Sequence, residues 1–68
     1  MHEFKLKSEY IELIKLLKLM GMAQTGGHAK ILVEEGEIFV NGKQETRKRL
    51  KLRKDDEVEV MGEKIRIK

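Results

Sequence analysis

Residues 35–43 read Glu-Gly-Glu-Ile-Phe-Val-Asn-Gly-Lys, and within them the spacing of apolar residues changes from helical to alternating. A glycine such as Gly36 commonly follows the last turn of a helix, because it adopts positive φ without strain. After it, Ile38 and Val40 lie two apart, as on one face of a strand. Asn41-Gly42 is the strongest short signal for a two-residue hairpin turn. This stretch therefore predicts the end of a helix, a strand and a return strand.

Two helices are expected before this stretch. For the first, Ser8 is the predicted N-cap and the helix spans about residues 9–20, with an apolar face made of Tyr10, Leu13, Leu16, Leu17 and Met20. For the second, Thr25 is the predicted N-cap and the helix continues to about Glu35, with a buried face made of Ala29, Leu32 and Val33. Ile31 falls outside that face, and we expect it to pack beneath a neighbouring loop.

Alternation of apolar and charged residues predicts the remaining strands. Phe4 and Leu6 alternate with charged neighbours, which indicates a short edge strand over residues 3–7. Past the hairpin, Leu50 and Leu52 share one face of a strand, and a closing hairpin follows with an inner face made of Val58, Val60, Ile65 and Ile67. The sequence therefore predicts an α+β fold in which two helices pack on a small bent antiparallel β-sheet, in a single domain over residues 1–68.

Composition argues against several classes of protein. The 68 residues contain no cysteine, and His2 and His28 lie far apart, so neither a disulfide nor a zinc site is expected. The first residues lack the apolar core of a signal peptide, and the apolar stretch near Lys15 and Lys18 is interrupted and too short to span a membrane. His28 has no accompanying nucleophile or paired carboxylate for catalysis. We therefore expect a cytoplasmic protein that is not an enzyme and that holds no metal or cofactor.

The cations are concentrated in one segment. Residues 43–54 contain a single acid, Glu45, and seven basic residues: Lys43, Arg47, Lys48, Arg49, Lys51, Arg53 and Lys54. In a continuous strand, side chains two apart would lie on one face, roughly 6.5–7 Å from one another, which resembles the phosphate spacing of a nucleic-acid strand. The four residues so placed are Arg47, Arg49, Lys51 and Arg53. Such a stripe is typical of nucleic-acid-binding surfaces, although solvated charged strands are also common.

The start of the second helix has a composition suited to anion binding. Thr25, His28 and Lys30 surround Gly26 and Gly27 with hydrogen-bond donors. The first N–H groups of a helix lack partners within it and have partial positive charge, and glycines leave them accessible to a phosphate. The alternative is that the glycines only allow two helices to approach closely at a tight turn.

From about residue 11 to residue 62 the chain resembles the S4 RNA-binding domain family, and within it the short stand-alone bacterial proteins of the YbcJ/YaaA type. The matching stretches are residues 16–18, 25–30 and 35–42 and, most specifically, residues 45–49 leading to Lys51. The resemblance implies a two-helix-plus-hairpin unit, the αL motif, that docks on structured RNA. It also implies RNA-facing residues at Thr25, Gly27, His28, Lys30, Arg47, Lys48, Arg49 and Lys51.

These observations together predict a ribosome-associated protein that binds structured RNA, either ribosomal or transfer RNA. The candidate contact residues are Lys18, Thr25, Gly27, His28, Lys30, Lys43, Arg47, Lys48, Arg49, Lys51 and Arg53. No aromatic platform for unpaired bases is expected, because Phe4 and Phe39 are assigned to the sheet and Tyr10 to the first helix.

The alternative is a protein–protein module in which the basic stripe binds an acidic partner surface and Ile31 acts as an anchor. In either case we expect a monomer that interacts with neither a membrane nor a small-molecule substrate.

Overall fold

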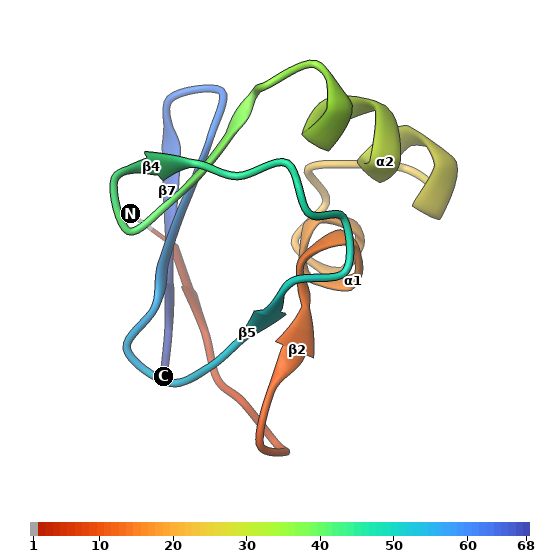
Figure 1. Cartoon of the computed structure of the whole chain (residues 1–68). Helices are drawn as coiled ribbons and strands as arrows, with labels where there is room; N and C mark the ends of the chain where they lie inside the picture. Colours follow the sequence, from red (N-terminus) through yellow and green to blue (C-terminus); the bar gives the residue numbers. More distant parts are fainter. Residues whose placement is uncertain (1) are drawn as a thin grey trace.

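The computed structural model describes residues 2–68, within which it places seven short strands and two helices. In chain order these are β1 (His2–Phe4), β2 (Ile11–Glu12), α1 (Leu13–Leu19), α2 (Gly26–Glu34), β3 (Ile38–Val40), β4 (Lys43–Gln44), β5 (Lys51–Leu52), β6 (Glu57–Val60) and β7 (Glu63–Ile67). Figure 1 shows α1 and α2 beside the larger sheet, with β2 and β5 forming a separate ribbon. Neither helix in this part of the chain combines the length and the apolar character that crossing a membrane requires.

Five strands form the larger sheet, in the order β1-β7-β6-β3-β4. The β3–β4, β3–β6 and β6–β7 pairs are antiparallel, whereas β1 runs parallel to β7, with His2 opposite Ile65. The predicted α+β fold is therefore confirmed, with one parallel pair added to an otherwise antiparallel sheet. β1 lies at the sheet edge, as predicted, but it spans His2–Phe4 and not residues 3–7, so Leu6 lies after the strand.

The core lies between the helices and the sheet. Its fully buried side chains come from α1, α2, β3, β5, β6 and β7, and they are Leu13, Leu16, Leu17, Ala29, Val33, Ile38, Leu52, Val58, Val60, Ile65 and Ile67. The predicted inner faces of α2 and of the closing hairpin are thus confirmed. Ile31, however, is 51% exposed, so the expectation that it packs beneath a loop is wrong.

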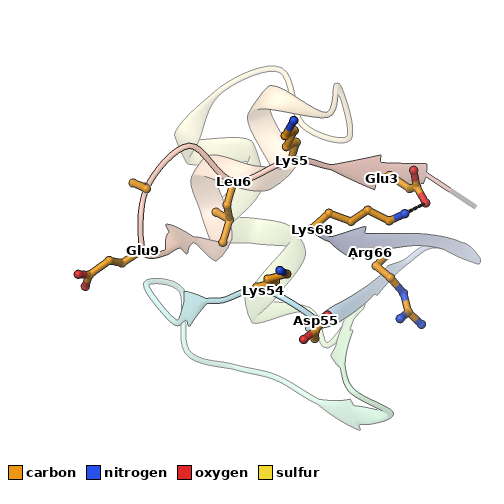
Figure 2. A pocket seen from close by; sticks show the side chains of 9 residues that line it. Glu3, Lys5, Leu6, Glu9, Lys54, Asp55, Arg66 and Lys68 are labelled. Atoms are coloured by element: carbon orange, nitrogen blue, oxygen red, sulfur yellow. Dashed lines mark ion pairs between the residues drawn. The ribbon is translucent and has the colours of Figure 1, made fainter.

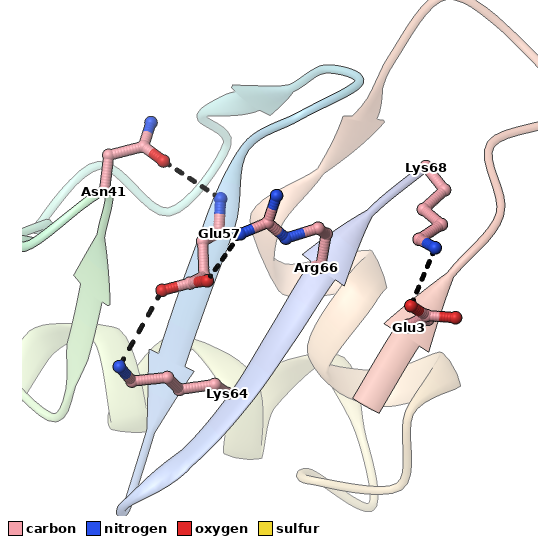
Figure 3. A network of polar contacts seen from close by, with 6 residues as sticks. All are labelled: Glu3, Asn41, Glu57, Lys64, Arg66 and Lys68. Atoms are coloured by element: carbon pink, nitrogen blue, oxygen red, sulfur yellow. Dashed lines mark hydrogen bonds and ion pairs between the residues drawn. The ribbon is translucent and has the colours of Figure 1, made fainter. Parts of the chain in front are cut away.

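Two glycine-containing turns behave as their sequence predicts. Gly36 follows α2 with a φ of +77°, and a Cβ at this position would clash with the side-chain amide of Gln44. Asn41 and Gly42, with φ values of 52° and 84°, connect β3 to β4. The Asn41 side chain also accepts a hydrogen bond from the Glu57 amide at 2.9 Å, which ties this turn to the start of β6 (Figure 3).

The first helix begins later than predicted. Ser8 is not an N-cap, because its hydroxyl donates to the Tyr10 carbonyl, and α1 begins only at Leu13. The amides of Leu13 and Ile14 donate to the carbonyls of Leu50 (2.9 Å) and Lys48 (3.3 Å). Backbone carbonyls from a distant segment therefore satisfy the start of α1, a role usually taken by a local side chain.

The predicted continuous basic strand is also wrong. Only Lys51 and Leu52 form a strand, β5, which pairs antiparallel with β2 through Ile11 opposite Leu52 and Glu12 opposite Lys51. Residues 48 and 49 lie in a turn. The evenly spaced row of four cations does not exist, because the carbonyls of this segment bend inward to the start of α1.

Candidate nucleic-acid interface

Two side chains fix the first turn of α2. The Thr25 hydroxyl accepts a hydrogen bond from the His28 amide at 3.0 Å, which confirms Thr25 as the N-cap. His28 Nδ1 accepts a hydrogen bond from the Gln24 amide at 3.2 Å. These two bonds are similar to a capping box, except that the His28 ring accepts from Gln24, the residue before the N-cap, and not from Thr25 itself. His28 therefore has a structural role through Nδ1, and its Nε2 is left for contact with a ligand.

The two glycines of this turn are not needed for close helix packing. A Cβ built at Gly26 would have no heavy atom within 4 Å, and one at Gly27 would meet only the Thr25 hydroxyl oxygen, at 3.8 Å. The alternative explanation for these glycines, a tight approach of two helices, is therefore wrong. The start of α2 is open to solvent, and its N–H groups provide partial positive charge there.

An ion pair connects the exposed face of α2 to the basic region. Lys48 Nζ lies 2.6 Å from Glu34 Oε2. Lys30 and Glu34 are four residues apart and are therefore neighbours on the helix surface. Lys48 thus lies on the same exposed side of the molecule as Lys30. Lys18 is exposed on α1, one turn after Ile14, whose amide donates to the Lys48 carbonyl.

We use the name basic segment for residues 47–53. Its side chains Arg47, Arg49, Lys51 and Arg53, together with Leu50, line a shallow hollow. Although the predicted strand is absent, the four cations that it was expected to align still surround one depression. Lys43, on β4, and Lys18, on α1, do not line this hollow.

Several of these cations have carboxylate partners at the surface. Glu45 accepts hydrogen bonds from the amide, Nε and Nη2 of Arg47, and this contact raises the pKa of Arg47 and lowers the pKa of Glu45. Arg49 Nε lies 3.4 Å from Glu12. The Arg49 side chain is 78% exposed and makes a single contact, so its pair with Glu12 contributes little to stability. A phosphate can therefore compete with Glu12 for Arg49. The Arg47–Glu45 pair is stronger, because it is bidentate and the Glu45 side chain is only 13% exposed.

Tyr10 is a residue of this region that the sequence interpretation misplaced. It lies just before β2 and not on a helix, its ring is partly exposed, and Lys51 Nζ and Arg53 Cζ lie 4.9 Å and 5.9 Å from the ring centroid. The assignment of Tyr10 to the first helix, on which the expected lack of an aromatic platform partly depended, is therefore wrong. The alternation of Tyr10 and Glu12 about the apolar Ile11 was the signal for a strand here.

A second hollow, shown in Figure 2, differs in charge from the basic one. Its cations are Lys5, Lys54, Arg66 and Lys68, and they are interleaved with the acids Glu3, Glu9 and Asp55. Lys68 Nζ lies 2.8 Å from Glu3, and its hydrogen bond to the Glu3 carboxylate lowers the pKa of that carboxyl group. The mixed charge makes this hollow less suited to a polyanion than the basic segment.

The outer face of the larger sheet is likewise balanced in charge. Glu57 Oε2 lies 3.1 Å from Arg66 Nη2, and Glu57 Oε1 lies 3.9 Å from Lys64 Nζ (Figure 3). Neither this face nor the hollow of Figure 2 therefore has the excess of positive charge found in the basic segment.

Comparison with known proteins identifies the family of this chain. The S4 domain pattern matches residues 4–68. The YbcJ protein of Escherichia coli (strain K12) is 39% identical over 61 residues, which are 90% of this chain and 87% of that protein, and an uncharacterised YbcJ from Shigella flexneri matches equally.

Solved structures give the same result. The solution structure of YbcJ from E. coli, described as revealing an αL motif involved in RNA binding, has a TM-score of 0.75 and 40% identity, and covers 98% of this chain and 86% of that one. The 30S ribosomal protein S4e from Thermoplasma acidophilum shares the fold, with a TM-score of 0.70 at 20% identity, covering 85% of this chain and 31% of that one. The chain therefore belongs to the S4 domain family.

Proposed function

We propose that this chain binds structured RNA, ribosomal or transfer RNA, through the start of α2 and the basic segment. The observation on which the proposal depends is the hollow lined by Arg47, Arg49, Lys51 and Arg53, joined to the Lys30 face of α2 through the Lys48–Glu34 ion pair. The RNA-binding role described for the αL motif of YbcJ supports it.

The mode of binding that suits this surface is recognition of backbone and shape. The major groove of duplex RNA is too narrow for side chains to read base edges, so proteins contact phosphates and 2′-hydroxyls across helices and at their junctions. Exposed guanidinium and ammonium groups around a shallow hollow provide such contacts. The N–H groups at the start of α2 provide a further site for a phosphate.

Within residues 2–68 no three histidine or acidic side chains are grouped to hold a metal ion. We propose that the chain acts as a single RNA-binding domain, as a monomer in the cytoplasm, and that it binds without catalysing a reaction.

The salt dependence of binding tests the electrostatic mechanism. Each phosphate neutralised contributes roughly −0.7 to −0.9 to the slope of log affinity against log salt. With about four to six contacts, we expect a slope of about −3 to −5 when a structured RNA is titrated with this chain at several salt concentrations. A slope near zero would contradict the mechanism, even if the RNA were bound.

The Gly27→Ala variant tests the role of the start of α2. Alanine has the higher helix propensity and finds room at this position, so we expect the unfolding free energy to rise by about 0.5 kcal/mol. The added methyl group lies beside the open N–H groups, so RNA affinity should fall about threefold to tenfold. Unfolding in urea and an RNA titration measure the two effects. Unchanged affinity would remove this turn from the interface.

A protein partner is the second candidate, and the exposure of Ile31 on α2 is the observation that favours it. An acidic surface with an apolar pocket would match Ile31 and the neighbouring Lys30. A purified one-to-one complex that survives nuclease treatment and is lost on Ile31→Asp would support this candidate against RNA binding.

A further inference from the structure

A groove between the segment that follows β1 and helix α1 is not part of the interface proposed above. Its volume is about 620 Å³, and its lining includes the apolar groups of Leu6, Tyr10 and Leu19 and the cations of Lys5, Lys7 and Lys15. Leu19 is 56% exposed, which is high for a leucine that faces a groove.

The lining of this groove has more cations than acids. Glu12 is the one acid of its lining, and that carboxylate lies 3.4 Å from Arg49 Nε. All three lysines are exposed. An occupant that combines a flat apolar body with negative charge matches this lining, and a nucleotide has both properties.

Tyr10 connects the groove to the basic segment. Its ring lines the groove, and Lys51 Nζ and Arg53 Cζ, from the segment that lines the basic hollow, lie 4.9 Å and 5.9 Å from the ring centroid. The register of β2 with β5 explains this contact. Ile11 and Leu52 face the core opposite each other, so the residue before Ile11 and the residue after Leu52 are neighbours on the outer face.

We propose, on the basis of the RNA-binding function inferred above, that this groove accepts an unpaired nucleotide of the bound RNA. The base stacks on the Tyr10 ring, and the phosphates on either side contact Lys51, Arg53 and the lysines of the groove. Stacking of a base on an aromatic ring is stronger than an exposed cation–π contact, so the base can displace Lys51 from the ring. The released ammonium group then contacts a phosphate. The groove thereby selects RNA duplexes interrupted by an unpaired base.

The composition of the chain allows a direct test in the unsubstituted protein. Tyr10 is the one tyrosine and there is no tryptophan, so tyrosine emission reports on this ring alone. The probes are a short blunt RNA duplex and the same duplex with one unpaired adenosine, each also prepared with a fluorescent label for anisotropy. A free tyrosine amide corrects for absorption by the RNA.

We expect the interrupted duplex to bind about fivefold to a hundredfold more tightly than the blunt one, and to quench tyrosine emission on saturation when the blunt one does not. The Tyr10→Ala variant should lose this preference and Tyr10→Phe should keep it. Phe39 is as exposed as Tyr10, at 37%, and lies on β3, so Phe39→Ala is the matched control and should keep the preference.

Equal affinity for the two duplexes without quenching would overturn this inference and leave the proposed RNA-binding function in place. Failure of both duplexes to bind at low salt would overturn both. If Tyr10→Ala does not fold, quenching in the unsubstituted chain still decides the question.

Discussion

Replacing Arg49, Lys51 and Arg53 together with glutamine is expected to weaken binding of structured RNA by about 100-fold at physiological salt. All three side chains line the same hollow. A contact between a cation and a phosphate contributes on the order of 1 kcal/mol here, and three such losses sum to roughly two powers of ten. The log–log salt slope should also become less negative by about two to three.

A matched control separates the position of the charges from their number. Lys64, Arg66 and Lys68 lie on or directly after β7, each with a carboxylate partner, and replacing them with glutamine removes the same net charge. This control should lose about threefold in affinity at most, because only the long-range field changes. Fluorescence anisotropy with a labelled RNA measures both variants. Equal losses would show that binding depends on net charge and not on the basic segment.

The Leu52→Ala variant is expected to lose about 3 kcal/mol of unfolding free energy. Leu52 is fully buried in the core cluster and lies opposite Ile11, so its truncation removes apolar contacts and leaves a cavity. A domain of this size has roughly 3–10 kcal/mol in total, so this loss removes about a third of its stability or more. Urea denaturation followed by far-UV circular dichroism gives the difference.

The same variant connects packing to the proposed function, because Leu52 lies between Lys51 and Arg53. Leu19, which is 56% exposed, provides the control of the same residue type. Leu19→Ala should change the unfolding free energy by less than about 0.5 kcal/mol. A Leu52→Ala protein as stable as this control would contradict the view that the basic segment is held in place by the core.

Helix-capping, turn and spacing rules, which depend only on nearby residues, were sufficient to predict the structure from Thr25 to Gly42. The N-cap of Thr25, the end of α2 at Gly36 and the hairpin at Asn41-Gly42 all depend on residues within a few positions of one another. The buried faces of α2 and of the β6–β7 hairpin follow from spacing alone. Each of these predictions is confirmed.

Two of the errors share one physical cause, which is contact between segments far apart in the chain. The start of α1 is capped by the carbonyls of Lys48 and Leu50, and β2 exists only because it pairs with β5. The late start of the helix and the bend in the basic segment are therefore one feature. The alternation around Ile11 indicates a short strand, but it does not reveal that β5 is its partner or that the carbonyls of Lys48 and Leu50 cap α1.

In the candidate site, too, the sequence predicts local features but not contacts between distant segments. Composition identified the cations of the basic segment, because charge can be counted along a sequence. Their partners Glu34 and Glu12, and the position of Tyr10 beside Lys51, depend on tertiary structure. The sequence predicted a continuous strand with an even row of four cations. In the folded chain the same four cations surround a hollow.

Amide chemical-shift mapping during titration with a structured RNA tests the central claim most directly, because it locates the contact surface without substituting any residue. The proposed interface predicts that the largest changes fall in residues 25–30 and 47–53. Changes concentrated on the outer face of the larger sheet, around Phe39 and Arg66, with the basic segment unaffected, would contradict it.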